Sequence, residues 1–265
     1  MDKKKKILTI ITFILLIIVF FLVYLVLNKY ILKNNFENQI LPIANKNENV
    51  IFKINKIVLF SNCDVKKKNT SISNFTLENL YQYTDMAIFI TNDAGEKTLE
   101  NTLKKVNINN IKFNTPPSVG DPKLYFKGLN QFAKGEYSDE NIIQNNLEFN
   151  ITSENDTNLD TPTLYNNLAN PITLSYINAN IKPDYTITDT SSPITYDGTL
   201  LKKCGISLES LTCNLSFDIY ITNNKDEEFK CTVFINIPLT TEDKTIYDGN
   251  ITLKQDTNFV FYRYK

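Results

Sequence analysis

Two hydrophobic patterns run along this chain: one uninterrupted apolar segment near the N-terminus, and short alternating segments from residue 50 onward. The first comprises the 21 residues from Ile7 to Leu27, which include no charged residue, no Gly and no Pro. A helix of that length rises about 1.5 Å per residue and matches a hydrocarbon core of roughly 30 Å. It lacks the polar stripe of a core helix in a soluble domain. Residues 7–27 are therefore predicted to be a transmembrane helix.

The residues after this segment favour a retained anchor over a cleaved signal peptide. A signal peptide has an apolar region of about 7–15 residues followed closely by small residues. Here Asn28, Lys29 and Tyr30 follow the apolar run, and the first cysteine, Cys63, is too distant for lipid attachment near the helix. We therefore expect one membrane-spanning helix that remains part of the protein and contacts the lipid bilayer.

Positive charge on the N-terminal side predicts the orientation of this helix. The basic cluster consists of Lys3, Lys4, Lys5 and Lys6. Because Lys and Arg near a transmembrane helix are retained on the cytoplasmic side, residues 1–6 are expected to form a cytoplasmic tail. The prediction is a single-pass protein of the cell membrane with an extracytoplasmic C-terminal domain.

Residues 28–49 are predicted to be a juxtamembrane spacer, helical as far as Leu41 and polar after Pro42. Beyond them, residues 64–74 are expected to form a loop and residues 75–83 a short helix. Alternation of apolar and polar residues predicts strands elsewhere. These strands are expected at residues 50–60, 86–91, 103–113, 123–127, 147–152, 172–178, 185–189, 211–221, 229–237, 250–254 and 258–264.

The clearest alternation predicts a hairpin with one buried face. Residues 211–221 and 229–237 both place apolar side chains at every second position. Closing the hairpin around residues 223–228 puts Cys213 opposite about Ile237 and Cys231 opposite about Ile219. At about 3.3 Å per residue the two sulfurs are then roughly 20 Å apart, which is too far for a disulfide.

About ten strands with turn-rich connections are typical of an antiparallel β-sandwich. The predicted fold class is therefore mainly β, with an N-terminal transmembrane helix followed by an extracytoplasmic β-sandwich over residues 50–265. Two immunoglobulin-like halves with a boundary near residues 153–165 are the alternative. The sequences ITYDGTL at 194–200 and TIYDGNITL at 245–253 echo each other, but no longer period extends from them.

Charge argues against nucleic acid as a partner. Six lysines at the helix (Lys3 to Lys6, Lys29 and Lys33) and Asp2 account for part of the 28 basic and 29 acidic residues, which leaves 22 basic and 28 acidic residues for the exported part. An acidic surface repels phosphate backbones. The abundance of Lys, Asn and Ile indicates an AT-rich genome, which suggests a bacterium.

Four cysteines in a domain outside the cytoplasm permit two disulfides. The pairing of Cys213 with Cys231 inside the hairpin is excluded. If disulfides form, the sequence favours a bridge between Cys204 and Cys213 or a bridge that includes Cys63. The alternative is four small buried apolar residues.

The absence of His and the spacing of other residues exclude most catalytic machinery. Ser-His-Asp and Cys-His sites need an imidazole base, and His-ligated zinc sites need an imidazole ligand. The sequence also has no Cys-x-x-Cys, no Ser-x-x-Lys and no phosphate-binding Gly-rich loop. Two carboxylates could still hydrolyse glycosidic bonds, because that reaction needs only a suitable Asp/Glu pair.

One metal site is conceivable, at Asp156, Asn158 and Asp160, whose alternate oxygen ligands resemble the first half of a calcium loop. Thr161 and Asn167 stand where such a loop needs Gly and Glu, so a plain acidic loop is the simpler interpretation. We expect no other cofactor.

The leading functional hypothesis is a non-enzymatic, membrane-anchored cell-surface protein whose β-sandwich binds or assembles with an envelope protein or glycan. The general layout resembles that of single-pass surface proteins of Gram-positive-type bacteria. The first alternative is a wall-glycan hydrolase, or an accessory to one, that uses Asp and Glu residues. The second is a membrane scaffold that acts through its transmembrane helix.

Overall fold

The computed structural model describes residues 3–45, 51–69, 75–92, 97–154, 160–187 and 194–263. The chain divides into two compact units, Met1–Asn49 and Val50–Lys265. Strands account for 52% of the residues and helices for 20%, so the predicted mainly β class with one N-terminal apolar helix is confirmed.

The first unit contains a single long helix, α1 (Lys3–Asn45). Ile7 and Leu27 both lie within it, and it continues past Pro42 to Asn45, four residues beyond the predicted helical end at Leu41. Its segment Ile11–Asn35, 25 residues long, is long and apolar enough to cross a membrane.

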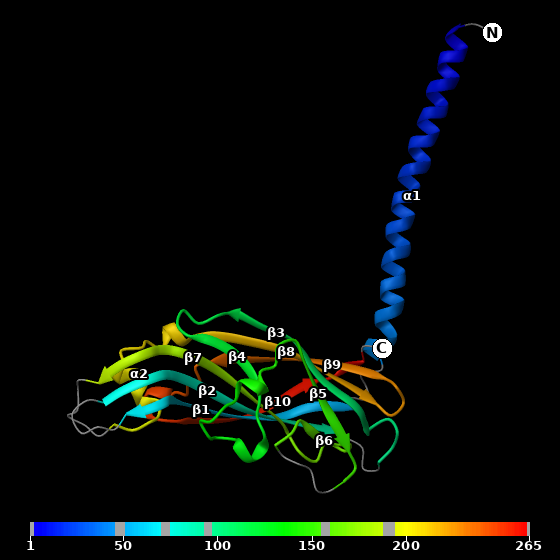
Figure 1. The fold of residues 1–265 in the computed structure, drawn as a ribbon. Coiled ribbons are helices and arrows are strands. Elements are labelled where there is room, and N and C mark those ends of the chain that lie inside the picture. Colours follow the sequence, from blue (N-terminus) through cyan, green and yellow to red (C-terminus); the bar gives the residue numbers. More distant parts are fainter. Residues whose placement is uncertain are drawn as a thin grey trace. The chain divides into compact units, whose positions relative to one another are not determined.

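The second unit contains two sheets (Figure 1). The first, sheet A, has the strand order β10-β1-β2-β7-β4, and the second, sheet B, has the order β11-β9-β8-β3-β5-β6. The strands of sheet A are β1 (Phe52–Asn69), β2 (Phe75–Asn92), β4 (Asp121–Phe126), β7 (Ile172–Ile187) and β10 (Ile251–Val260). The strands of sheet B are β3 (Leu103–Thr115), β5 (Asn146–Thr152), β6 (Thr163–Tyr165), β8 (Cys213–Asn223), β9 (Glu228–Ile237) and β11 (Tyr262–Arg263).

Neighbouring strands pair antiparallel, except β5 with β6, which are parallel. Both sheets combine strands from before and after residues 153–165. Residues 50–265 form one compact unit, so the alternative of two domains with a boundary there is wrong.

One hydrophobic core joins the two sheets. Because side chains alternate along a strand, each sheet directs every second residue toward this core. Members of the core from sheet A include Ile57, Met86 and Leu174, and members from sheet B include Val106, Ile219 and Val233. All six are fully shielded from solvent. The core therefore fixes which face of each sheet remains available for other contacts.

The predicted hairpin is confirmed in strands and register. β8 and β9 pair along their length, with Cys213 opposite Ile237 and Ile219 opposite Cys231. The two cysteines are therefore separated along the hairpin as the alternation of apolar residues predicted.

Two predictions near the start of the unit are wrong. Residues 75–83, predicted as a helix, belong to strand β2, and residues 64–69, predicted as part of a loop, belong to strand β1. The two strands form a long hairpin that continues to the pair Asn69 and Thr76. Backbone pairing holds this distal part, so the polar run DVKKKN could form a strand without apolar alternation.

The two echoing Asp-Gly sequences pack against each other. A Cβ built on Gly198 would lie 1.9 Å from the Ile246 carbonyl oxygen, and one on Gly249 would lie 3.5 Å from Asp197 Oδ2. The first sequence leads into the helix α2 (Thr199–Lys203), and the second contains the 3-10 helix η5 (Ile246–Asp248) before β10. They are different local structures in contact.

Candidate functional site

The face of sheet A that points away from the core is covered by residues 127–145, the connection between β4 and β5. Beneath it lies a second apolar cluster made of Tyr81, Tyr83, Tyr125 and Ile177. Strand alternation explains this cluster, because the neighbouring residues Leu80, Leu124 and Tyr176 belong to the main core. The connection contains two 3-10 helices, η2 (Leu129–Gln131) and η3 (Asp139–Asn141).

A buried ion pair lies under this connection. Lys127 Nζ is 2.9 Å from Asp85 Oδ2 and 3.0 Å from Oδ1. The Asp85 side chain is fully buried and that of Lys127 is 5% exposed. The Ser175 hydroxyl donates to Asp85 Oδ1 at 2.6 Å, and the Ala133 backbone N–H donates to Oδ2 at 2.8 Å. The carboxylate is therefore surrounded by donors from β7 and from the connection.

Burial and pairing act in opposite directions on these two groups. Burial raises the pKa of the Asp85 carboxyl, and the Lys127 ammonium, the Ser175 hydroxyl and the Ala133 N–H oppose that shift. Burial likewise lowers the pKa of the Lys127 ammonium, and Asp85 opposes that shift. Each charge is thus stabilised mainly by the other, because both side chains are almost fully buried.

Three consecutive residues of the connection are held by hydrogen bonds to sheet A or to the buried ion pair. Asp85 holds the N–H of Ala133, Lys127 donates to the carbonyl of Lys134, and the Tyr81 hydroxyl donates to the carbonyl of Gly135 at 2.9 Å. Ala133 has a φ of +62°, a left-handed conformation that costs a non-glycine residue about 1–2 kcal/mol. The hydrogen bonds to the ion pair and to Tyr81 therefore hold the connection in a strained but fixed shape.

Close approach explains the glycine in this triplet. A Cβ on Gly135 would lie 2.8 Å from Asp64 Oδ2 and 3.4 Å from the Tyr81 hydroxyl. A glycine lets the backbone lie this close to the two side chains without displacing them.

Tyrosine rings form one wall of the site. The Tyr137 ring packs edge-on against Tyr81, with 4.9 Å between ring centroids, and against Tyr125, with 5.4 Å. Lys66 Nζ lies 5.0 Å from the centroid of the Tyr137 ring. Burial raises the pKa of Tyr81, Tyr125 and Tyr137, so their hydroxyls remain protonated donors at neutral pH.

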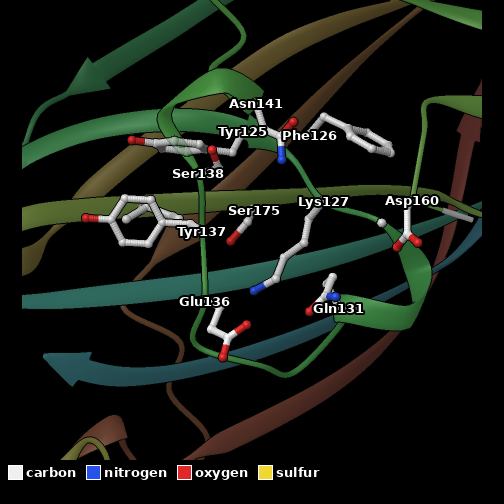
Figure 2. A pocket seen from close by; sticks show the side chains of 12 residues that line it. Tyr125, Phe126, Lys127, Gln131, Glu136, Tyr137, Ser138, Asn141, Asp160 and Ser175 are labelled. Carbon is white, nitrogen blue, oxygen red and sulfur yellow. The ribbon is translucent and has the colours of Figure 1, made fainter. Parts of the chain in front are cut away.

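A cavity of about 330 Å³ opens between this connection and the sheet. Figure 2 shows Lys127 pointing into its centre, with Glu136 and Gln131 beside the ammonium group. Tyr125 and Tyr137 lie on one side and Asp160 on the other in that view. Ser138 and Asn141 add a hydroxyl and an amide to the lining. The cavity therefore combines aromatic surface with neutral and charged hydrogen-bonding groups.

The cavity could bind a small polar molecule. The volume of the cavity is at the lower end of the range for small-molecule sites, about 300–1,000 Å³. Glu136 and Asp160 contribute two carboxylates to the lining, and the Asp85 carboxylate, outside the lining, is engaged by Lys127, Ser175 and Ala133. Asp85 therefore positions the lining, and the groups facing a ligand are the others.

The calcium candidate is only partly described. Asp156 and Asn158 lie outside the described residues, and Asp160 lines the cavity. In the part of the chain that the structure describes, no group of three or more Cys, Asp or Glu residues could hold a metal ion. Calcium binding stays a prediction.

The predicted Cys204–Cys213 bridge is not formed. All four cysteines are buried free thiols. Cys204 ends α2, where its carbonyl accepts from the Lys182 ammonium at 2.7 Å, whereas Cys213 begins β8 opposite Ile237. Cys63 instead donates its thiol hydrogen to the Asp197 carbonyl at 2.7 Å. The interpretation of the cysteines as small buried residues agrees with this arrangement.

We expect the folded protein to resist thiol alkylation. Burial raises the pKa of all four thiols, that of Cys204 to about 11 and that of Cys231 to about 12, so little reactive thiolate exists at pH 8. Iodoacetamide at pH 8 should add no group to the native chain and four groups after unfolding without reductant, as measured by intact mass. Four additions only after reduction would instead demonstrate disulfides.

The residues that build this site were not singled out from the sequence, apart from Asp160. Asp85 comes from β2, whereas Lys127 and Ala133 come from the connection that follows β4. One sequence signal was present: Tyr81, Tyr83 and Asp85 alternate with Gln82 and Thr84, which places the two tyrosines and the carboxylate on one face of a strand.

Comparison of the chain with models of protein families, with curated proteins and with solved structures found no match.

Proposed function

We propose that this is a non-enzymatic, membrane-anchored surface protein, and that the cavity beneath residues 127–145 binds a short segment of an envelope glycan. In this proposal, α1 spans the membrane with Lys3 to Lys6 in the cytoplasm, and the β-rich unit is an extracytoplasmic antiparallel sandwich. The length and apolar composition of Ile11–Asn35 support the anchor. The lysines before the apolar segment support the orientation.

The cavity carries the binding proposal. Sugars offer hydroxyl groups in many directions and apolar ring faces, so they fit a site that combines aromatic rings with amides, hydroxyls and carboxylates. Tyr125 and Tyr137 provide the rings, and Gln131, Ser138 and Asn141 provide neutral hydrogen-bonding groups. The volume of about 330 Å³ suits one or two sugar rings better than a folded protein surface.

Rigidity supports binding as the role of this site. The Asp85–Lys127 pair and Tyr81 hold residues 133–135 in place before any ligand arrives. A prearranged site loses less conformational entropy when it binds, which favours affinity for a small ligand.

A binding assay on whole protoplasts tests ligand and topology together. We expect a fluorescent trimer of N-acetylglucosamine to bind bacterial protoplasts that produce the full chain, and Tyr137→Ala to weaken binding about tenfold or more through loss of ring contact. Tyr262→Ala is the matched control, because Tyr262 is 55% exposed and does not line the cavity; it should bind as the unchanged protein does.

The outcomes separate the two parts of the proposal. Binding by the detergent-solubilised chain but not by protoplasts would contradict the orientation and leave the ligand class intact. If neither form binds this trimer or the corresponding glucose oligomers, or if Tyr137→Ala binds equally well, glycan binding at this cavity is wrong.

A second candidate is glycoside hydrolysis, and one observation favours it: Glu136 and Asp160 line the same cavity. Such an enzyme needs one carboxyl as acid and another as base or nucleophile. Release of reducing ends from wall glycan by the full chain, abolished by Glu136→Gln, would replace the non-enzymatic proposal.

A further inference from the structure

Strand β9 has a free edge. On one side β8 pairs with it from Glu228 to Ile237, but on the other side β11 pairs only with Phe229 and Lys230. The residues that precede β11 do not continue along β9. Phe261 is buried and donates its N–H to the Phe52 carbonyl in sheet A at 3.1 Å instead. Within the described parts of the chain, no other strand pairs with residues 231–237.

This edge differs from the other sheet edges in composition. Natural proteins protect edge strands by charge, by Pro or by short length. The edge strand β4 carries Asp121 and Pro122, β10 carries Lys254 and Asp256, and β6 is three residues long. Residues 231–237, with the sequence CTVFINI, contain no charge and no Pro. The free part of β9 therefore has the composition of a strand that is paired on both sides.

The space beside this edge can accept the side chains of another strand. A cavity of about 380 Å³ lies between Cys231 in β9 and Phe259 in β10, and another of about 260 Å³ lies between Ile235 and Leu253 of the same two strands. On the other face, Phe234 is 61% exposed in the middle of the free stretch. An added strand would thus gain backbone hydrogen bonds and contacts on both faces.

We propose that residues 231–237 of β9 pair antiparallel with the same residues of a second copy of this chain, around a twofold axis at Phe234. The free stretch is symmetric about this residue, so both copies pair over all seven positions. Phe234 then faces Phe234, and Thr232 faces Asn236. The same uncharged surface on both copies meets no like charge, which a self-pairing edge requires.

The size of the contact determines where it forms. Two seven-residue strands make a small contact compared with the roughly 1,200–2,000 Å² of a stable interface. Pairing is therefore weak between freely diffusing chains and is strengthened when both copies are tethered in one membrane. In this respect the inference rests on the anchor in the proposed function, but it is independent of the cavity and its ligand.

Cysteine crosslinking of the full chain in its membrane tests the register. The four native thiols are buried, so a cysteine placed on the β9 edge is the accessible one. Copper-phenanthroline with oxygen takes two electrons and two protons from two facing thiols to form the disulfide. Phe234→Cys should give a covalent dimer, because facing Cβ atoms in a strand pair are about 4.5–5.5 Å apart.

Two further variants make the test specific. Thr232→Cys alone and Asn236→Cys alone should stay monomeric, because like residues would be about 13 Å apart along the strands. When the Thr232→Cys and Asn236→Cys variants carry different tags and are produced in the same membrane, they should form a mixed covalent dimer. Adding Phe234→Lys to both copies should lower its yield about fivefold or more, through loss of the Phe pair and like-charge repulsion. The matched control, Thr252→Lys at an exposed position of the β10 edge, should leave the yield unchanged.

Each outcome decides one question. Monomeric Phe234→Cys in the membrane fraction, or equal crosslinking at positions 232, 234 and 236, would overturn the pairing. If the chain is absent from the membrane fraction, the proposed anchor fails instead. The same cysteine series on the concentrated purified chain then decides the pairing: the Phe234-centred pattern supports it, and any other pattern overturns it.

Discussion

Replacing Asp85 by Asn should lower the free energy of unfolding by about 3–5 kcal/mol. The substitution leaves the Lys127 ammonium, which is 5% exposed, without its counter-charge. The carboxylate accepts hydrogen bonds from the Ala133 N–H and the Ser175 hydroxyl. The amide of Asn would turn its NH₂ group, itself a donor, toward one of them. Urea unfolding of the full chain in detergent, followed by tyrosine fluorescence, measures the loss; the chain has 14 Tyr and no Trp.

A surface ion pair provides the matched control for this substitution. Glu148 lies 2.9 Å from Lys105, but both side chains are about half exposed, so Glu148→Gln should change the free energy of unfolding by less than about 1 kcal/mol. Adding Lys127→Met to Asp85→Asn should recover part of the loss, because no charge then remains buried. A double variant as unstable as Asp85→Asn would show that the hydrogen bonds to Ser175 and Ala133, and not the charge, account for the effect.

Gly198→Ala should be the other strongly destabilising substitution, with a loss of about 3 kcal/mol or more. The added methyl group would lie 1.9 Å from the Ile246 carbonyl oxygen and 2.2 Å from that of Gly249. Both are backbone atoms, so the turn that precedes β10 must move. Gly198 is itself held in place, because its N–H donates to the Asn62 side-chain oxygen at 3.0 Å. Thermal unfolding of the full chain measures the effect.

Gly205→Ala separates lack of space from backbone conformation. Gly205 has a φ of +69°, but a Cβ there meets nothing within 4 Å, so we expect a cost of about 1 kcal/mol from conformation alone. Gly198 has an ordinary φ of −57°, so its larger cost would come from the close backbone contact. Equal losses in the two variants would contradict this explanation.

The sequence predicted strands well where one face of a strand is buried along its whole length. β8 and β9 are such strands, and their alternation gave both the strands and the register. The strand at residues 86–91 was predicted, but the first part of β2, residues 75–83, was missed because its pairing with β7 shifts register between Leu80 and Gln82. Asn79 and Asn180, near this irregularity on the two strands, have φ values of +56° and +54°. The interrupted alternation places Leu77 and Leu80 three residues apart, which is also the spacing of a helix face.

The candidate site depends on tertiary contacts that no local pattern contains. Asp85 and Lys127 are 42 positions apart, and β7 lies between β2, which carries Asp85, and β4, which Lys127 follows. A single Asp before an apolar run is ordinary at the start of a strand, and a single Lys at the end of a short strand is ordinary on a surface. Only the covering of sheet A by residues 127–145 makes them a buried pair.

The place of the last long strand has a consequence for how the protein is made. β10 pairs with β1, so the first strand of the unit is an inner strand of sheet A only after Ile251–Val260 has been synthesised. Until then, the side of β1 that receives β10 is an open edge, and a nascent chain cannot complete its fold by adding strands in order. Premature termination shortly before residue 251 would release a nearly full-length product with that edge exposed, a form prone to aggregation and a suitable substrate for quality-control proteases.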